Sequence, residues 1–181
     1  MMGFVEAFEL EVDLVAASDK KPASRKIILQ NHGFTHLFKS ADDHIRGRGY
    51  CEKHGQICEL NCGVDLVCGG LSCHPFSHMK QRTGTSARTS RPCDHPDYML
   101  VMEGFPEFLK NRRPGGFIVE EVEAILDRIP SSQKRYIDIL VENCVTAGYA
   151  CRARVIQHSD WIQWPRSRQA ESHSIFTEST Y

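Results

Sequence analysis

One cysteine stands in a sequence context that suits a reactive thiol. Residues 64–77 read VDLVCGGLSCHPFS, an apolar run that reaches Gly69 and Gly70 and is followed by Cys73. The valines and leucine at its start favour a buried β-strand, and the two glycines favour a turn at its end. We therefore expect Cys73 in a loop at the carboxyl end of a strand, where open α/β sheets bind their ligands. A thiol in such a loop can be presented to a substrate as a nucleophile, because its thiolate is the reactive form.

A pair of glutamates lies near the end of a second predicted strand. Residues 117–122 read FIVEEV and follow a proline–glycine turn. Alternation along a strand places Glu120 on one face and Glu121 on the other. We expect Glu120 on the apolar face, where loss of hydration favours a protonated carboxyl that can act as an acid. The alternative is that both glutamates begin the next helix, where negative charge is favoured, and Glu121 fits that alternative better.

A carboxylate also follows the first predicted strand. Residues 12–17 (VDLVAA) favour a strand, and residues 20–31 favour a helix with Pro22 near its start. Asp19 lies between them, where nucleotide-binding α/β folds place a carboxylate on the ribose hydroxyls. Local sequence alone favours a simpler role for Asp19, as a cap of the helix.

These stretches together resemble the DNA cytosine-C5 methyltransferases. The pattern Gly-Gly-Pro-Pro-Cys-Gln-x-Phe-Ser surrounds that family's catalytic cysteine, and residues 69–77 keep its glycines, cysteine, phenylalanine and serine. Ser72 and His74 replace the family's proline and glutamine on either side of the cysteine. Residues 120–122 (Glu-Glu-Val) resemble the family's Glu-Asn-Val, and residues 165–168 (Pro-Arg-Ser-Arg) resemble a later arginine motif. The order of these motifs along the chain is also that of the family.

The resemblance implies a Rossmann-like α/β core that uses S-adenosyl-L-methionine to methylate C5 of a cytosine flipped out of double-stranded DNA. It implies three catalytic residues, namely Cys73 as the nucleophile, Glu120 at N3 of the base and Arg168 at O2. The cofactor-binding residues that it implies are Phe4, Asp19 and Asp43. The location that it implies is the nucleus, or more generally the inside of the cell.

The resemblance extends over residues 3–168. We therefore expect a partial catalytic domain over residues 1–169 and a frayed, polar tail over residues 170–181. The family's first strand, target-recognition region and final helix have no counterpart in the sequence, so a longer chain or a partner would complete the site. Two alternatives stay open: a non-catalytic remnant that acts as a binding module, and a cytosine-C5 methyltransferase that acts on tRNA.

Composition limits the classes of protein that the chain can belong to. Its 181 residues are 41% hydrophobic, which suits one domain with a core of its own. The formal net charge of −1 gives no overall basic surface for nucleic acid. The sequence has no 18-residue apolar run and no signal-peptide pattern, so we expect a soluble protein with no membrane partner.

The eight cysteines favour free thiols over a disulfide framework, because no secretion signal is present. Four residues that can bind zinc lie close together: Cys51, His54, Cys58 and Cys62. A small zinc-binding protein built on them is a third possibility. Their spacing differs from the Cys-x2-Cys pairs of zinc motifs, however, so we expect a solvated, cysteine-rich loop and no metal site.

The remaining elements connect these candidate residues. Residues 81–91, rich in Ser, Thr and Arg, predict a mobile loop that either contacts phosphates or is an ordinary surface loop. A helix is predicted over residues 97–113, with a restart at Pro106. A second, amphipathic helix is predicted over residues 131–146, capped by Ser131 or Ser132, and a strand over residues 149–157.

Overall fold

A computed structural model describes residues 11–77, 91–130, 132–157 and 173–180, and only the backbone of residues 157 and 173–180. The chain forms two compact units, Met1–Val64 (unit 1) and Asp65–Tyr181 (unit 2), where the sequence predicts one domain over residues 1–169. Each unit combines helices with a four-stranded sheet, so the predicted mixed α/β class is confirmed.

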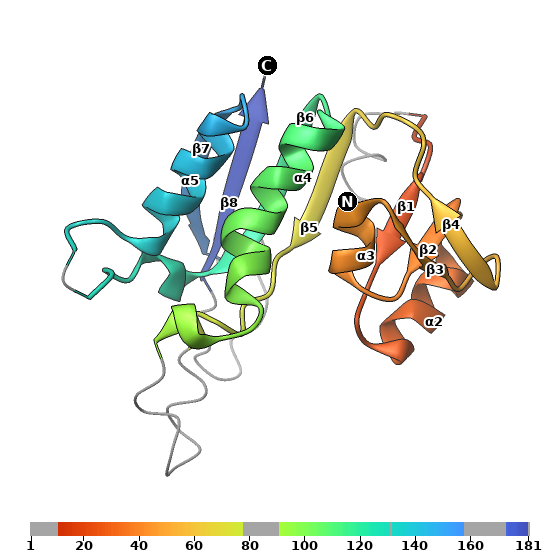
Figure 1. Cartoon of the computed structure of the whole chain (residues 1–181), viewed down its shortest axis with the longest axis horizontal. Helices are drawn as coiled ribbons and strands as arrows, with labels where there is room; N and C mark the ends of the chain where they lie inside the picture. The colour runs from red at the N-terminus through yellow and green to blue at the C-terminus, as the bar shows by residue number, and fades with distance from the viewer. Residues whose placement is uncertain (1–10, 78–90, 131, 158–172, 181) are drawn as a thin grey trace, which may run out of the picture. The chain divides into compact units, whose positions relative to one another are not determined.

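Unit 1 begins with one strand–helix–strand unit and ends with a hairpin (Figure 1). Its elements are β1 (Ala16–Ser18), α2 (Pro22–Asn31), β2 (His36–Phe38), α3 (Ala41–Arg46), β3 (Arg48–Cys51) and β4 (Gln56–Glu59). The strand order is β1-β2-β3-β4, with β1 parallel to β2 and the other pairs antiparallel. The parallel pair is possible because α2 provides the crossover between its two strands.

The region that the sequence predicts to be a solvated loop is instead the centre of unit 1. Its side chains form a small buried cluster consisting of Phe38, Cys51, Cys58 and Leu60. The prediction of a loop was wrong because each strand is only three or four residues long, too short to show a clear alternation of apolar residues. Helix α3 is stabilised at its start by Ser40, whose hydroxyl accepts the Asp43 N–H at 3.1 Å.

Unit 2 contains a second sheet with helices over one of its faces. Its elements are β5 (Leu66–Gly70), η3 (Pro92–Asp94), η4 (Leu100–Gly104), α4 (Phe105–Arg112), β6 (Gly116–Val122), η5 (Glu123–Leu126), α5 (Tyr136–Thr146), β7 (Ala150–Gln157) and β8 (His173–Thr180). The strand order is β5-β6-β8-β7, in which β5 and β6 are parallel while β8 is antiparallel to both of its neighbours. Figure 1 shows α4 and α5 side by side over this sheet.

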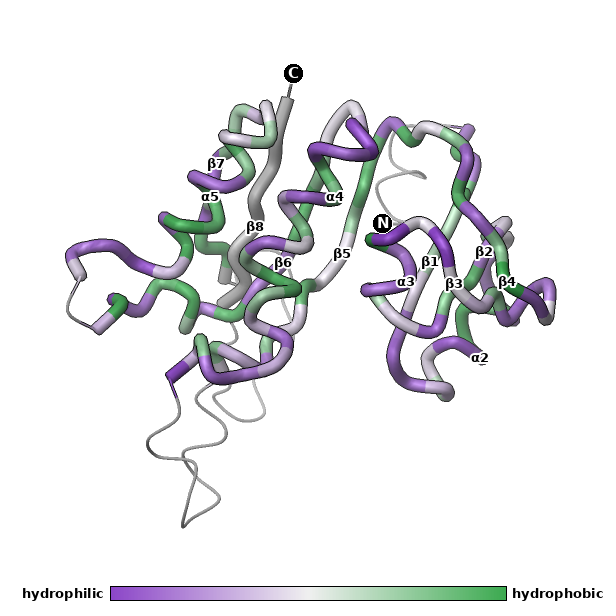
Figure 2. Tube along the Cα trace, viewed as in Figure 1, coloured by the Kyte–Doolittle hydropathy of each residue, from purple (hydrophilic) through white to green (hydrophobic). Residues whose placement is uncertain are grey.

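The core of unit 2 is built on aromatic rings between the sheet and α4. Phe117 of β6 meets Phe105 and Tyr149 edge to face, with ring centroids 5.4 and 5.5 Å apart. All three side chains are buried. Polar and apolar residues alternate along the turns of α4 (Figure 2), as expected for a helix with one face on a core.

The predicted helices are present, with different starts. Pro106 lies in the first turn of α4, which confirms the predicted restart, and the π-helical turn η4 precedes it. Helix α5 begins at Tyr136, and its cap is formed by Arg135 and Asp138 rather than by Ser132. Ser131 lies outside the described residues. No helix in the described part of the chain is long and apolar enough to cross a membrane.

Strand β8 lies where the sequence predicts a polar tail. Its backbone pairs with Ile118–Val122 of β6 on one side and with all of β7 on the other. The prediction was wrong because the segment HSIFTEST lacks the apolar alternation of a half-buried strand. The two neighbouring strands, β6 and β7, supply hydrogen-bond partners for its backbone. These bonds stabilise β8 although its side chains lack the apolar alternation.

Candidate active site

The parallel pair of β5 and β6 brings two of the predicted catalytic segments together. Gly70, the last residue of β5, is opposite Glu120 near the end of β6. Leu71 follows β5 directly and donates its N–H to the carbonyl oxygen of Glu120 at 3.2 Å. Since the carboxyl ends of parallel strands meet at one edge of a sheet, the loop that carries Cys73 leaves the sheet beside Glu120.

The loop after β5 is present, but Gly69 and Gly70 do not form its turn. Both belong to β5, and neither has a positive φ. The turn begins at Cys73, whose carbonyl oxygen accepts the N–H groups of Phe76 at 3.1 Å and Ser77 at 2.9 Å. Cys73 is partly exposed, as a residue that presents a nucleophile to a substrate must be.

The expectation that β5 is buried was wrong. Its residues are mostly exposed, and 44% of Leu66 is accessible to solvent. Among the described strands, β5 lies at the edge of its sheet and pairs with β6 alone, so no second described strand encloses its apolar residues. A run of apolar residues predicts a strand without predicting which of its sides are covered.

Two of the residues that depart from the family pattern, Ser72 and His74, hold the loop in place. Ser72 donates its hydroxyl hydrogen to a carboxylate oxygen of Asp97 at 2.8 Å. The Nδ1 atom of His74 is 3.9 Å from the same oxygen, and the His74 ring stacks on His95 with centroids 6.0 Å apart. Asp97 donates its own N–H to His95 Nδ1 at 3.1 Å. Ser72 and His74 therefore fix both sides of Cys73 to the segment before α4.

Phe76 provides an apolar anchor three residues after Cys73. Its side chain is 4% exposed. Its ring centroid lies 6.1 Å from that of Tyr98 and 5.5 Å from that of Tyr136, which begins α5. The Cys73 loop is thus held at both ends, by the β6 backbone and by this aromatic cluster.

The two glutamates of β6 occupy environments opposite to those predicted. Glu120 is exposed, whereas Glu121 is 4% exposed and lies on the face of Phe117 and Val119. The predicted alternation is confirmed, but the face that includes Glu121 is the buried one because it is turned toward the aromatic core. The pKa of the Glu121 carboxyl is raised to about 7, chiefly by burial. The hydrogen bond from the Val122 N–H at 3.1 Å opposes this rise, and the charge of Glu120 adds to it. Its Oε1 has no hydrogen-bond partner among the described residues.

The remaining predicted residues are distributed over the chain. Arg168 and Phe4 lie outside the described residues. Asp19 follows β1, where its carboxylate accepts the Lys21 N–H at 2.6 Å. Asp43 lies in the first turn of α3, and its side chain packs so closely on Gly49 that a Cβ there would collide with it.

A second group of chemically capable side chains, in unit 1, was only partly predicted. The side chains of His36, Cys51, His54 and Cys58 converge, with one possible ligand atom from each within 4.8 Å of the others. The short spacing from Cys51 to Cys58 was visible in the sequence. The sequence could not show that His36 joins this group, because that depends on the pairing of β2 with β3. Cys62, which the sequence suggested as a ligand, is exposed and is not one of the four.

Comparison with known proteins adds no family name. No family model matches the chain, and no curated protein is significantly similar to it. Its chemistry is therefore inferred from the side chains described above.

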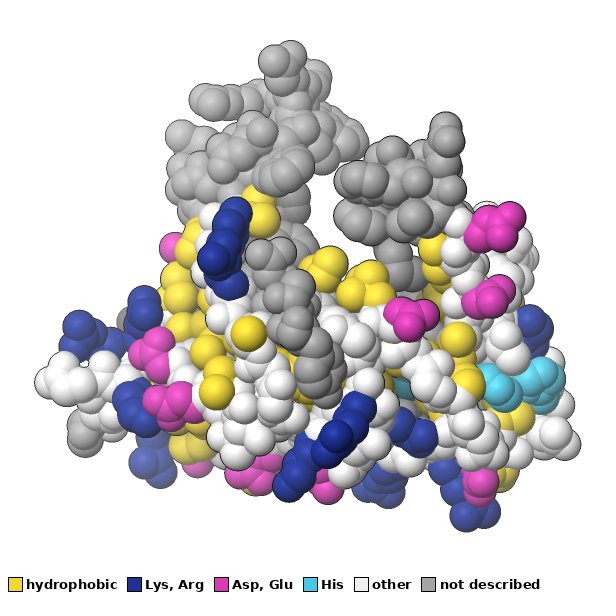
Figure 3. Space-filling model, turned by 90° about the horizontal axis from the view of Figure 1, so that it is seen from above, with side chains coloured by type: hydrophobic (Ala, Val, Ile, Leu, Met, Phe, Trp, Pro, Cys, Tyr) yellow, Lys and Arg dark blue, Asp and Glu magenta, His cyan; other side chains and the backbone are white. Residues whose placement is uncertain are grey.

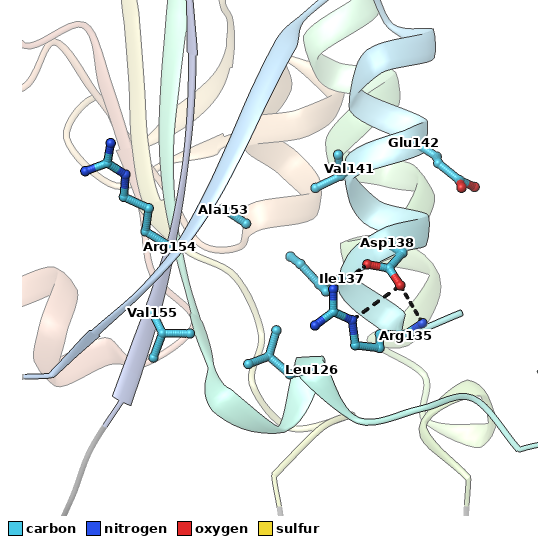
Figure 4. A pocket seen from close by; sticks show the side chains of 9 residues that line it. All are labelled: Leu126, Arg135, Ile137, Asp138, Val141, Glu142, Ala153, Arg154 and Val155. Carbon is cyan, nitrogen blue, oxygen red and sulfur yellow. Dashed lines mark hydrogen bonds and ion pairs between the residues drawn. The ribbon is translucent and has the colours of Figure 1, made fainter. Parts of the chain in front are cut away.

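An open cleft of about 500 Å³ lies between α5 and β7 (Figure 4). Arg135 and Asp138 face each other at its side, with a nitrogen–oxygen distance of 3.2 Å. Strand β7 is at the opposite edge of the sheet from β5, and neither Cys73 nor Glu120 is among the described residues that line the cleft. The cleft is therefore not part of the candidate active site.

Proposed function

We propose that this chain is the catalytic core of a cytosine-C5 methyltransferase that acts on DNA. The proposal depends chiefly on the register of β5 and β6, which brings the Cys73 loop beside Glu120. Methylation of cytosine at C5 needs a thiolate to attack C6 and an acid at N3. A thiol and a carboxyl from two neighbouring strand ends supply those two groups.

We also propose that the fold is a Rossmann-like methyltransferase core. Two features support this: a strand–helix–strand unit with parallel strands in each unit of the chain, and an antiparallel strand beside the parallel pair of unit 2. Ligands of such folds bind at the carboxyl ends of the parallel strands. Both Cys73 and Asp19 follow strands of that kind.

The chemistry proceeds through a bond between the protein and the base. The Cys73 thiolate attacks C6, forming a C–S bond and moving electron density to C5. Glu120, which is exposed in the free protein, takes up a proton once the base covers it, donates that proton to N3 and neutralises the charge that develops on the ring. S-Adenosyl-L-methionine, when bound, supplies the methyl group that C5 takes up. Loss of the C5 proton to water then restores the double bond and expels Cys73 as the thiolate, and N3 returns its proton to Glu120.

The acidic residues of unit 1 differ in how well they fit that cofactor. Asp19 lies at the carboxyl end of β1, and Ser18 beside it is joined to His44 of α3 by a 3.2 Å hydrogen bond. A carboxylate at this edge suits the ribose hydroxyls of an adenosine group. Asp43 fits less well, because its side chain is turned against Gly49. We therefore assign the ribose contact to Asp19 alone.

The proposed substrate is a cytosine that has left the DNA stack, since C6 is inaccessible within a duplex. Acidic and basic side chains are interspersed on the face shown in Figure 3, in agreement with the net charge of −1. Contacts to DNA phosphates would then depend on local groups, including Arg168 and the arginines of residues 81–91 that were predicted for this role. A location in the nucleus, or more generally inside the cell with its DNA, is part of this proposal.

A DNA duplex that contains 5-fluorocytosine tests the proposal. Fluorine at C5 blocks the final loss of a proton, so the enzyme stays attached to the base through Cys73. We expect the natural full-length protein, with S-adenosyl-L-methionine, to form a denaturant-stable adduct. Cys73→Ser should abolish the adduct, whereas Cys68→Ser, which removes an exposed thiol from β5, should retain it.

Two outcomes contradict the proposal. If the natural protein forms no adduct with any duplex that contains 5-fluorocytosine, the chain does not have this activity. If 5-fluorocytosine in tRNA traps the protein and DNA does not, the chemistry stands but the substrate is RNA.

A further inference from the structure

Four side chains that commonly bind metals converge in the sheet of unit 1. They are His36 at the start of β2, Cys51 at the end of β3, His54 in the following turn and Cys58 in β4. One ligand atom from each lies within 4.8 Å of the others. We propose that these four residues form a structural zinc site. The site is independent of the proposed methyl transfer.

The register of the strands explains the convergence. Cys51 is opposite Phe38 of β2, so His36, two residues before Phe38, lies on the same face of the sheet. Cys58 is opposite Gly49, two residues before Cys51, and therefore also lies on that face. Three ligands from three strands are thus neighbours before any metal binds.

The turn between β3 and β4 adds the fourth ligand. Gly55 has a φ of 67°, a conformation that residues with a side chain rarely adopt, and its N–H donates to the Cys51 carbonyl oxygen at 2.9 Å. This turn directs Nδ1 of His54 at both thiols, 3.4 Å from Cys51 Sγ and 3.3 Å from Cys58 Sγ. Sulfur and nitrogen ligands of a tetrahedral zinc ion are roughly 3.6 Å apart. These two nitrogen–sulfur distances are therefore within a few tenths of an ångström of those in a zinc site.

The surroundings of the cluster suit a bound cation. Cys51 is fully buried and Cys58 is 9% exposed, so little water reaches either sulfur. Nδ1 of His36 is buried without a hydrogen-bond partner among the described residues, an arrangement that is unfavourable unless the atom binds something. Leu37 donates its N–H to Cys51 Sγ at 3.4 Å, a contact that supports a metal-bound thiolate.

The donor set points to zinc and to a structural role. Two thiolates and two imidazoles in a tetrahedral arrangement match zinc, whereas calcium and magnesium prefer oxygen ligands. Four protein ligands leave no position open for a substrate. A zinc ion here would join β2 to the β3–β4 hairpin in a unit whose buried core is small, where a metal contributes directly to folding.

The zinc content of the purified protein tests this assignment. We expect close to one zinc ion per chain by elemental analysis, released when the thiols are modified. Cys58→Ser should lose most of that zinc, and His36→Asn should weaken its retention against a chelator at least tenfold. Cys62→Ser is the matched control, because Cys62 is an exposed thiol only four residues from Cys58, and it should keep the full zinc content.

A second measurement avoids the problem of variants that do not fold. The unmodified protein reconstituted with Co²⁺ should show the visible absorption of a tetrahedral ion together with thiolate-to-metal charge transfer. A protein that takes up neither metal, an octahedral cobalt spectrum, or equal loss of zinc in Cys58→Ser and Cys62→Ser would overturn the assignment. A disulfide between Cys51 and Cys58 in the freshly purified protein would also overturn it.

Discussion

Gly70 and Glu120 are opposite each other in the parallel ladder of β5 and β6, and a carboxylate oxygen of Glu120 lies 3.7 Å from where a Gly70 Cβ would be. The absence of a side chain at Gly70 leaves that side of the Glu120 carboxylate uncovered. Glu120 is exposed at the same end of the sheet from which the Cys73 loop departs. In the proposed mechanism, this is the carboxyl group that acts on a base bound at Cys73.

Replacing Glu120 with glutamine should slow methyl transfer by about 10²–10⁴-fold, the usual contribution of a general acid. Glutamine retains the size and the hydrogen-bonding ability of the side chain but cannot donate a carboxyl proton. We expect the rate of single-turnover methyl transfer from labelled S-adenosyl-L-methionine to fall, while Glu120→Gln unfolds at the same temperature as the natural protein.

Glu123→Gln is the control for that substitution. Glu123 is an exposed carboxylate in η5, three residues after Glu120, and it has no assigned catalytic role. Its replacement should leave the rate within about twofold. Equal rates for Glu120→Gln and the natural protein would remove Glu120 from the mechanism.

Local signals were sufficient to predict several elements of this fold. Proline favours the first turn of a helix because a backbone N–H at that position has no partner within the helix, so its absence costs nothing. Pro22 and Pro106 both lie in first turns. The run FIVEEV is rich in β-branched residues and forms β6 as expected. Such signals depend only on neighbouring residues, which the sequence displays directly.

Features that depend on distant contacts were not predicted. The sequence shows that Glu120 and Glu121 lie on opposite faces of β6, but it does not show which face α4 covers. In the same way, β8 and the fourth residue of the metal-binding cluster, His36, depend on which strands become neighbours. Along α5, Val145 is 53% exposed while Cys144 beside it is buried, a difference that depends on which side of the helix the sheet covers.

Tyr149→Phe should destabilise unit 2 by about 1–2 kcal/mol, the cost of losing a buried hydrogen bond. The Tyr149 hydroxyl donates to the Pro114 carbonyl oxygen at 2.8 Å, and the side chain is 2% exposed. Its removal leaves that carbonyl oxygen without this donor just before β6 begins. Urea denaturation followed by circular dichroism gives the change in the free energy of unfolding.

Tyr50→Phe is the comparison for that measurement, since Tyr50 is 39% exposed in β3. Because Tyr50 is exposed, water can hydrogen-bond to the groups around its hydroxyl once that hydroxyl is removed. The free energy of unfolding should therefore change by less than about 0.5 kcal/mol. If both variants lose the same amount of stability, the hydrogen bond to Pro114 has no special role in holding the start of β6.

Glu121 should make the protein more stable in mild acid than in mild base. The pKa of its carboxyl is raised from 4.5 to about 7 in the folded protein, so the folded state binds this proton more tightly than the unfolded chain. The resulting stabilisation is complete below about pH 4.5 and is lost as the pH rises through 7. At low pH, this proton contributes about 3 kcal/mol to the free energy of unfolding.

Glu121→Gln should remove this pH dependence, because an amide occupies the same space without ionising. Urea denaturation at pH 5 and pH 8 should show a smaller loss of stability in Glu121→Gln than in the natural protein, with the difference approaching about 3 kcal/mol. Glu123→Gln, which changes an exposed carboxylate two residues away, should retain the natural dependence. An unchanged pH dependence in Glu121→Gln would mean that the Glu121 carboxyl stays ionised and hydrated at neutral pH, contrary to its position on the buried face of β6.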